Sequence, residues 1–348
     1  MRSYSSPRRA SRPTHESADA QRGEAERRPA ARARANSERE GRAELACARM
    51  SDPRPSVVRA TLRALRPQQW IKNLLLFVPV LLAHDVLDAP RLLGALQGFV
   101  AFCLCASGGY VLNDLLDREA DRQHPRKRHR PFAAGHLSAR QGGLLFAALL
   151  AAALGLATRV GPSFLLLLAL YGALTIAYSL WLKQMVFLDV LLLSALYSLR
   201  LFAGAVAANV EISQWLLGFS LFLFLSLAFV KRFCELRQLA ESSPGASPAR
   251  RGYQPEDLAL IQMLGSTSGY LSVLVLALYI SSSDVMRLYA TPQLLWAVCP
   301  VLLYWLTRIW FLAGRGELPD DPLLFAAADP QSYVAGALIA LTGFLATL

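Results

Sequence analysis

Blocks of apolar residues make up most of the chain after residue 50, and each is close to the length that crosses a lipid bilayer. A membrane-spanning helix takes about 20 mostly apolar residues, and by this criterion the sequence holds about nine blocks. Their approximate bounds are Trp70–Ala83, Leu92–Leu112, Leu137–Ala157, Pro162–Leu182, Phe187–Ala208, Trp215–Val230, Leu258–Ile280, Leu294–Leu312 and Tyr333–Leu348. The pattern predicts an all-α fold, a polytopic bundle of transmembrane helices.

The first 49 residues differ in composition from the rest of the chain. They are rich in Arg, Ala, Glu and Ser, and Tyr4 is their only aromatic residue. Such a segment cannot bury a core, so we expect residues 1–49 to be disordered; they also lack the apolar stretch of a secretory signal. We expect translation to begin at Met50, with a basic tail that touches anionic lipid as the alternative. Residues 50–348 are predicted to form a single transmembrane domain.

The distribution of positive charge predicts the orientation of the bundle. The net charge is +11, and basic residues gather in the connections after the second and sixth blocks, whereas alternate connections carry few. Cytoplasmic connections carry an excess of Lys and Arg. We therefore expect an integral protein of a bacterial-type inner or plasma membrane, with these connections in the cytoplasm. The charge indicates anionic lipid or phosphate as partners, and no aromatic-interleaved basic stretch of the sequence indicates nucleic acid.

Three aspartates follow the second apolar block at helical spacing. Asp114, Asp117 and Asp121 stand at i, i+3 and i+7 after Asn113, so their side chains are expected to share one face of one helix. Carboxylates this close repel each other unless a cation lies among them. Oxygen ligands suit Mg²⁺, which takes one or two protein carboxylates and completes its shell with water and phosphate. The alternative is a helix at the membrane surface whose charges are solvated.

A basic run continues from the aspartates. It includes Arg118, Lys127, Arg128 and Arg130, which are suited to the phosphate charge that a metal leaves exposed. The stretch therefore predicts a diphosphate-binding site at the membrane surface.

Charged residues also stand at the start of the fifth block. Asp189 lies within an apolar run, where a carboxylate is expensive in lipid and should face the bundle interior with a partner. Lys183 or Arg200 is the expected partner, and Tyr178 precedes them at the end of the fourth block. The alternative is a buried ion pair that only fixes helix packing.

A second basic segment continues the sixth block. Lys231 and Arg232 are candidates to hold phosphate, with Glu235 facing the site; the alternative is a Lys231–Glu235 pair that stabilises the helix. The loop from Ser242 to Pro255 could close over the site. The carboxylates of Asp320 and Asp321 are expected to lie in a solvated turn.

These motifs resemble the UbiA superfamily of intramembrane prenyltransferases, from about Leu65 to the C-terminus. The family motif NDxxDxxxD stands here from Asn113 to Asp121, and in the family it binds Mg²⁺ and a diphosphate. The second Asp-rich motif of the family is missing after the sixth block, where Lys231–Arg237 stands instead.

The chain is similar to the branch that contains decaprenyl-phosphate phosphoribosyltransferase, through Arg66–Asn73, Asp121–Pro131, the Tyr178–Asp189 pattern and the Lys-Arg-x-x-Glu-Leu segment. This resemblance implies Mg²⁺-dependent transfer of 5-phosphoribosyl from phosphoribosyl diphosphate to a polyprenyl (decaprenyl) phosphate. It implies catalytic roles for Asp114, Asp117 and Asp189, metal binding by Asp114, Asp117 and Asp121, and substrate binding by Asn113, Lys72, Arg118, Lys127, Arg128, Arg130, Tyr178, Lys183, Lys231, Arg232 and Glu235.

Two other functions stay open on the sequence. In prenyl transfer, the metal site would hold a prenyl diphosphate and an aromatic or other hydrophobic acceptor would attack. A transporter or a non-catalytic membrane protein is the third possibility, and it would be favoured by inverted repeats, which the sequence does not show.

Overall fold

The computed structural model describes residues 56–83, 85, 87–123, 127–242, 252–319 and 321–348. The chain divides into two compact units, Met1–Pro55 and Ser56–Leu348, and only the second is described here. The predictions for residues 1–49 and Met50 therefore lie outside the described residues. The described part of the second unit contains helices and no strand, which confirms the all-α class.

The first half of the unit runs from α2 to α8. Its elements are α2 (Val57–Leu65), η1 (Pro67–Phe77), α3 (Val78–Leu82), α4 (Ala89–Leu116), α5 (Arg118–Gln123), η2 (Lys127–His129), α6 (Ala139–Val160), α7 (Pro162–Leu180), η3 (Leu182–Gln184) and α8 (Leu188–Ala208). The second half comprises α9 (Gln214–Ser242), η4 (Pro255–Asp257), α10 (Leu258–Ile280), α11 (Ser283–Leu288), η5 (Pro292–Ala297), α12 (Val298–Arg315), α13 (Pro322–Ala326) and α14 (Pro330–Thr347).

The number of spans differs from the sequence prediction. Among the described residues, seven helices are long and apolar enough to cross a membrane, so the expected count of nine is not confirmed. The first expected span is instead the 3₁₀ helix η1 followed by the short α3, whose second residue is Pro79. Proline lacks the N–H that would continue the preceding turn. The last expected span forms α14, which begins with the polar Pro330–Tyr333 stretch and is not among the seven.

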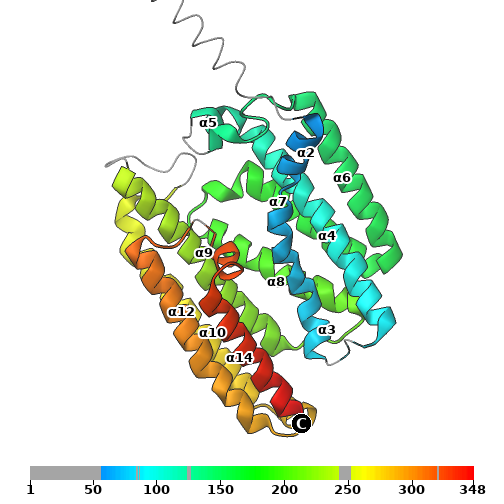
Figure 1. Ribbon diagram of the computed structural model, residues 1–348, viewed down its shortest axis with the longest axis vertical. Helices are drawn as coiled ribbons and strands as arrows, with labels where there is room; N and C mark the ends of the chain where they lie inside the picture. Colours follow the sequence, from blue (N-terminus) through cyan, green and yellow to red (C-terminus); the bar gives the residue numbers. More distant parts are fainter. Residues whose placement is uncertain (1–55, 84, 86, 124–126, 243–251, 320) are drawn as a thin grey trace, which may run out of the picture. The chain divides into compact units, whose positions relative to one another are not determined.

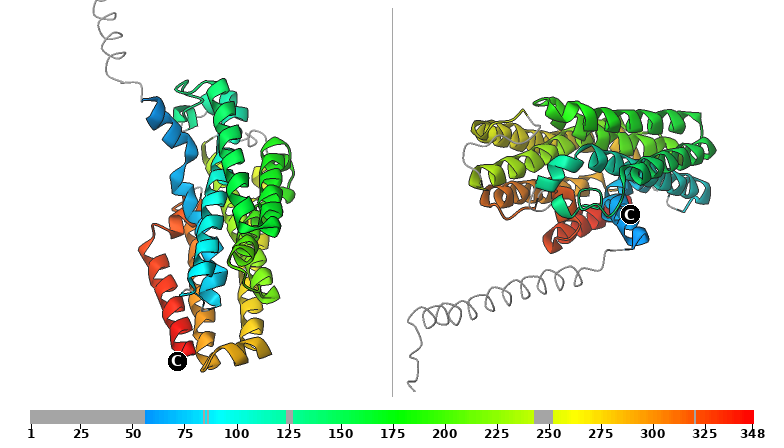
Figure 2. Two further views of the ribbon diagram at one scale, coloured as in Figure 1. Left: turned by 90° about the vertical axis from the view of Figure 1, so that its right-hand side faces the viewer. Right: turned by 90° about the horizontal axis from the view of Figure 1, so that it is seen from above.

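The helices pack in two neighbouring groups (Figures 1 and 2). In one, α4 contacts α6, α7 and α8; in the other, α9 contacts α10, and α12 contacts both α10 and α14. The contact between α8 and α9 joins the groups. A buried apolar cluster lies on each side of this seam, around Phe164 and Leu168 on one side and around Phe229 and Trp310 on the other.

Residues at the helix ends explain the sharp connections. Ser138 and Gln141 form a reciprocal capping box at the start of α6, which satisfies backbone donors that have no partner within the helix. Gly161 links α6 to α7 at φ 144°, a conformation that glycine adopts without a Cβ clash. Pro162 follows it at the first position of α7, where the missing N–H costs nothing.

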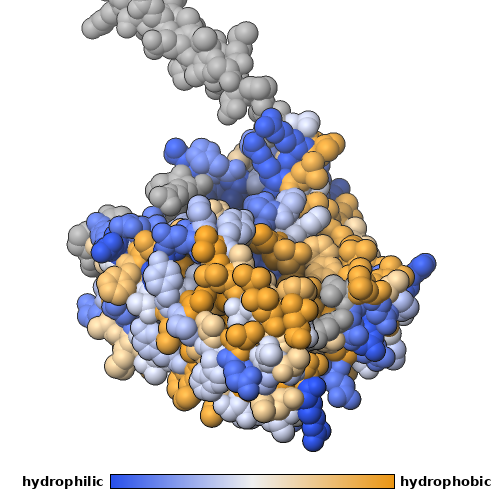
Figure 3. Space-filling model, turned by 60° about the horizontal axis from the view of Figure 1, so that its bottom comes forward, coloured by the Kyte–Doolittle hydropathy of each residue, from blue (hydrophilic) through white to orange (hydrophobic). Residues whose placement is uncertain are grey.

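The outer surface of the bundle is apolar over wide areas. Figure 3 shows apolar side chains gathered across the middle of one face. In α6, only 11% of the most apolar stretch is buried inside the protein, although that stretch is among the most hydrophobic. Lipid is the environment that suits such a surface, because a soluble monomer rarely exposes apolar patches of this extent.

The 3₁₀ helix η1 lies against α4 and α8 at close range. A Cβ added to Gly204 of α8 would stand 2.1 Å from the carbonyl oxygen of Leu76. We expect Gly204→Ala to push η1 away and to lower the free energy of unfolding by about 1–3 kcal/mol. Thermal unfolding in detergent measures this effect. Gly155→Ala in α6 is the matched control, because nothing lies within 4 Å of its Cβ position, and an unfolding temperature for Gly204→Ala no lower than that of this control would contradict the prediction.

Candidate active site

Asp114, near the end of α4, lies at the centre of the first charged cluster. Its residue is 1% exposed, and its carboxylate accepts hydrogen bonds from Arg66 at 2.6 and 2.9 Å and from Arg130 at 3.1 Å. The same Nη1 atom of Arg130 donates to Asp121 at 2.7 Å. One guanidinium nitrogen thus stands between two of the predicted metal ligands.

The prediction that the three aspartates lie on one continuous helix is wrong. Helix α4 ends at Leu116, Asp117 caps it at φ −91° and ψ 5°, and α5 begins at Arg118. The chain still turns in a nearly helical way, because the Asp121 N–H donates to the carbonyl of Asp117 at 2.8 Å. Asp114 and Asp121 share Arg130 as a partner, whereas the break in the helix turns Asp117 toward a different residue.

That partner is Lys183 of η3. Its ammonium donates to both carboxylate oxygens of Asp117 at 2.9 Å and lies 3.4 Å from the amide oxygen of Asn113. Lys183 is 8% exposed. The sequence motif around Asn113 and the lysine seventy residues later therefore meet in one place.

Asp189 has partners other than those expected. Its carboxylate lies 2.8 Å from Nε of Arg232 and accepts a hydrogen bond from the Tyr253 hydroxyl at 2.7 Å. The angle at Arg232 Nε does not suit a hydrogen bond, so that contact is an ion pair. The prediction of Lys183 or Arg200 as the partner is wrong. Lys183 faces Asp117, and Arg200 lies about 16 Å further along α8.

Arg232 is surrounded by protein groups. Its residue is 1% exposed, it forms an ion pair with Glu235, and its guanidinium lies 3.5 Å from the Tyr178 hydroxyl. The alternative interpretation of this segment was a helix-stabilising pair between Lys231 and Glu235, but the structure pairs Glu235 with Arg232. The structure thus brings Tyr178, Arg232, Glu235 and Asp189 together.

Tyr253 is a site residue that the sequence did not reveal. It precedes η4, accepts a hydrogen bond from the Phe187 N–H at 2.9 Å and donates to Asp189. Burial, followed by the hydrogen bond to Asp189, raises the pKa of the Tyr253 phenol above its ordinary value, so the hydroxyl keeps its proton. It lies at the end of the expected closing loop, of which residues 243–251 are outside the described residues.

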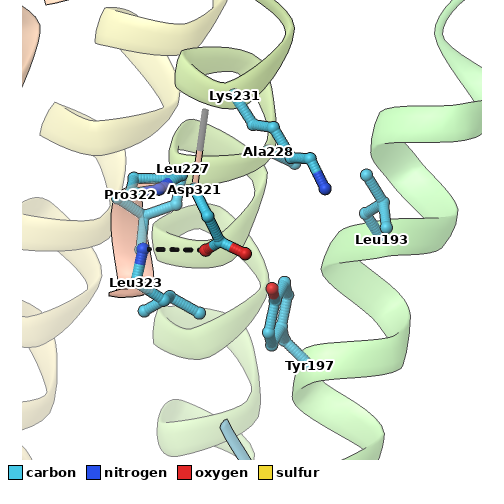
Figure 4. Close-up of a pocket in the computed structure, with 8 residues that line it drawn as sticks. All are labelled: Leu193, Tyr197, Leu227, Ala228, Lys231, Asp321, Pro322 and Leu323. Atoms are coloured by element: carbon cyan, nitrogen blue, oxygen red, sulfur yellow. Dashed lines mark hydrogen bonds between the residues drawn. The ribbon is translucent and has the colours of Figure 1, made fainter. Parts of the chain in front are cut away.

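A third charged cluster includes Lys72 of η1. Its ammonium forms an ion pair with Asp321, and Lys231 of α9 lines the same small pocket as Asp321 (Figure 4). The prediction that Asp321 lies in a solvated turn is wrong, because its side chain is 18% exposed. Burial would raise the pKa of this carboxyl, but the charges of Lys72 and Lys231 outweigh burial and hold the pKa below its usual range.

Arg200 lies deeper in the bundle with neutral partners. It is 5% exposed and donates to Asn73 at 2.9 Å, to the carbonyl of Leu196 at 2.6 Å and to the Tyr171 hydroxyl at 2.7 Å. Since Asn73 belongs to η1, Arg200 helps to hold the segment that carries Lys72. No carboxylate of the described chain forms an ion pair with it.

Three predicted site residues lie at the surface. Arg118 pairs with Glu119, Arg128 is exposed and contacts the neighbouring His129 at 3.4 Å, and Lys127 is exposed. The structure does not bring these residues to the buried carboxylates. Their contact with substrate phosphate stays a prediction.

Arg66 is the other site residue that the sequence did not single out. It precedes Pro67 and adopts a left-handed conformation at φ 51°, which turns its side chain from the N-terminus of η1 toward Asp114. Its guanidinium also lies 5.3 Å from the centre of the Tyr110 ring. The signal available in the sequence was a basic residue four positions before the first apolar block.

The carboxylates are compatible with Mg²⁺ in their chemistry. Within the described residues, no three acidic, His or Cys side chains gather closely enough to hold a metal ion. Mg²⁺ needs only one or two protein carboxylates, however. Asp114 and Asp121 already face one cationic nitrogen from two sides. The donor set therefore fits, and the metal-binding role of Asp114, Asp117 and Asp121 stays a prediction.

Comparison with known proteins assigns the family. The sequence model of the UbiA prenyltransferase family matches residues 74–328, which is well over half of the chain. The chain belongs to the UbiA prenyltransferase family. With its apolar helices, this membership makes it an integral membrane transferase, and the all-α transmembrane fold expected from the sequence is confirmed.

Several curated proteins resemble this UbiA-family chain. Nodulation protein NoeC of Azorhizobium caulinodans is 41% identical over 275 residues, which cover 78% of the chain and 88% of NoeC. The decaprenyl-phosphate phosphoribosyltransferase of Corynebacterium glutamicum is 34% identical over 224 residues, 63% of the chain and 68% of that enzyme. An uncharacterized protein, y4nM of Sinorhizobium fredii, is 39% identical over 84% of the chain, and the match spans only 56% of y4nM.

Solved structures share the fold. A UbiA homolog from Archaeoglobus fulgidus bound to GPP and Mg²⁺ superposes with a TM-score of 0.61, at 18% identity, over 83% of the chain and 99% of that structure. At this identity the likeness concerns the fold alone.

Proposed function

We propose that this UbiA-family chain transfers the 5-phosphoribosyl group of phosphoribosyl diphosphate to the phosphate of a polyprenyl lipid such as decaprenyl phosphate, with Mg²⁺ as cofactor. The observation that carries the proposal is the position of Lys231. Lys231 lines a pocket with apolar walls, together with Asp321, and Asp321 in turn pairs with Lys72. Lys231 belongs to the helix on which the family pattern has a second Asp-rich motif. Lysines suit an anionic acceptor, whereas a second set of aspartates suits a metal-bound diphosphate.

On the donor side, cations accompany every predicted metal ligand. Arg66, Arg130 and Lys183 already contact Asp114, Asp117 and Asp121. In the proposal the three aspartates would hold Mg²⁺, which neutralises charge on a leaving diphosphate when it is bound. The released guanidinium and ammonium groups would then bind the remaining phosphate oxygens, with charge-assisted hydrogen bonds.

The transfer balances without an added acid or base. The bond from ribose C1 to the diphosphate oxygen breaks, and its electron pair leaves with the diphosphate. An oxygen of the lipid phosphate forms the new bond to C1. Because the acceptor is already an anion, no strong base is needed, and the role of Arg130 and Lys183 is to stabilise the charge that grows on the leaving group.

On the acceptor side, Lys72 and Lys231 would hold the lipid phosphate. Apolar residues of α8, α9 and α13 stand around them. Asp189 and Glu235 form ion pairs with Arg232, which we place between the two halves of the site, and Tyr253 donates a hydrogen bond to Asp189. The basic connections nearby indicate, by the positive-inside rule, a site on the cytoplasmic face of a bacterial inner membrane, within a transferase domain of residues 50–348.

Prenyl transfer is the second candidate. It is favoured by the fold neighbour that carries GPP together with Mg²⁺. In that reaction an allylic diphosphate would occupy the Asp114 cluster, and a hydrophobic acceptor would take the place of the lipid phosphate.

Paired assays on proteoliposomes with Mg²⁺ distinguish the two. One supplies labelled phosphoribosyl diphosphate and decaprenyl phosphate; the other supplies labelled geranyl diphosphate and 4-hydroxybenzoate. We expect labelled lipid in the first assay only, and its loss when Mg²⁺ is chelated. Label in the second assay alone would overturn the proposal in favour of prenyl transfer.

A further inference from the structure

The pocket around Lys231 holds more positive than negative charge. Lys72 and Lys231 contribute two ammonium groups, and Asp321 contributes one carboxylate that pairs with Lys72; Glu235, which also acts on Lys231, is paired with Arg232. Within the described residues, no hydrogen bond and no ion pair within 4 Å reaches the Lys231 ammonium. Figure 4 shows this side chain and the Asp321 carboxylate turned toward the same space, bordered by the ring of Tyr197.

The walls of this pocket are apolar. They are formed by Leu193, Leu227, Ala228, Pro322 and Leu323, together with Tyr197. An ammonium group beside such walls is stabilised by a directly bound anion, because the apolar walls offer it no hydrogen-bond acceptor. A phosphate monoester on an apolar chain matches both features, since it brings about two negative charges and a hydrophobic tail.

Asp321 reaches the pocket from the short connection between α12 and α14. Its Oδ1 atom accepts hydrogen bonds from the N–H groups of Leu323 and Leu324, while its Oδ2 atom faces Lys72. The capping bonds fix the start of α13 and aim the second oxygen at the lysine. A carboxylate so placed would repel an incoming phosphate at close range.

We propose that Lys72 and Lys231 form the subsite for the phosphate of the acceptor lipid, and that Asp321 occupies this subsite as a displaceable internal anion that limits acceptor affinity. The inference rests on the proposed function for the identity of the acceptor. Asp321 keeps Lys72 paired while no lipid is bound, and it gives up Lys72 when a phosphate monoester arrives.

Calorimetry on the detergent-solubilised full chain, in buffer without metal or phosphoribosyl diphosphate, tests the proposal with farnesyl phosphate as the probe. Asp321→Asn removes the competing charge and keeps the cap, since Asn caps helices as well as Asp does. We expect it to tighten farnesyl phosphate binding about tenfold. Lys231→Met is expected to weaken that binding about tenfold.

The matched control is Asp329→Asn. Asp329 also caps a helix and pairs with an arginine, Arg308, but it does not line the pocket that contains Lys231 and Asp321. We expect no change in farnesyl phosphate affinity in this variant. Inorganic phosphate, titrated in parallel, is expected to bind at least tenfold more weakly than farnesyl phosphate, because it leaves the apolar walls exposed; equal affinities would overturn the lipid as the source of the phosphate.

Weaker or unchanged binding by Asp321→Asn, or no binding of farnesyl phosphate to any variant, would overturn the inference. The two proposals fail separately. Tighter binding by Asp321→Asn without any phosphoribosyl transfer would keep the subsite and reject the reaction. Phosphoribosyl transfer with unaltered binding in Asp321→Asn would keep the reaction and reject the role of Asp321.

Discussion

Asp117→Asn is expected to lower turnover about 10²–10³-fold, the loss that follows removal of one group that stabilises charge in a transition state. Asp117 combines the two properties that the donor side needs. It is one of the predicted metal ligands, and in the resting structure its carboxylate holds the ammonium of Lys183. The substitution removes both. Phosphoribosyl transfer in proteoliposomes, measured across a Mg²⁺ titration, is the experiment.

Glu119→Gln is the control for this variant. Glu119 lies two residues further on, its side chain is 65% exposed, and its ion pairs are with Arg118 and Arg122. The Glu119→Gln substitution removes one negative charge from the same segment as Asp117→Asn does. We expect its turnover to stay within about twofold of the wild-type value, as for surface substitutions away from a site. Wild-type turnover and Mg²⁺ dependence in Asp117→Asn would remove Asp117 from the catalytic machinery.

Arg232→Met is expected to have the largest effect on stability. It leaves the Asp189 carboxylate, which is 0% exposed, with the Tyr253 hydroxyl but without its cation. Removing one partner of a buried ion pair typically destabilises a protein by about 3–5 kcal/mol. We expect a clear drop in the unfolding temperature of the detergent-solubilised protein, and tryptophan fluorescence measures that temperature.

The double variant Asp189→Leu with Arg232→Met separates stability from function. Replacing both partners by apolar side chains is often close to neutral, so we expect most of the unfolding temperature to return while transferase activity stays low. Arg128→Met, at an exposed position, should change stability by less than about 0.5 kcal/mol. An Arg232→Met protein as stable as the Arg128→Met control would show that the ion pair with Asp189 does not support the fold.

The sequence predicted that Asp189, inside an apolar run, would be buried with a partner, which the structure confirms, whereas the helix expected through Asp114, Asp117 and Asp121 breaks at Asp117. The motif from Asn113 to Asp121 and the charges at Lys183 and Lys231 do lie in buried or half-buried positions among the helix ends. The lack of a second Asp-rich motif after the sixth block, where Lys231–Arg237 stands, could be read from the sequence residue by residue.

The partners of these charges could not be predicted, because they come from distant segments. Arg66 reaches Asp114 across 48 residues, and Lys72 reaches Asp321 across 249. Both contacts depend on how η1 packs, and η1 was expected to be part of a membrane span. Asp189 shows the same limit, since charge alone favoured Lys183 or Arg200, whereas packing of α9 against α8 brought Arg232.

The type of helix in η1 sets a distance. Eleven residues in a 3₁₀ helix form an unusually long run, since such runs seldom exceed about four residues. Arg66 precedes η1, and from Pro67, the first residue of η1, to Lys72 the helix rises about 10 Å at about 2.0 Å per residue. In an α-helix the same stretch from Pro67 to Lys72 would rise only about 7.5 Å. The 3₁₀ geometry of η1 therefore places Lys72 further from the start of the helix, where Arg66 stands, than an α-helix of the same residues would.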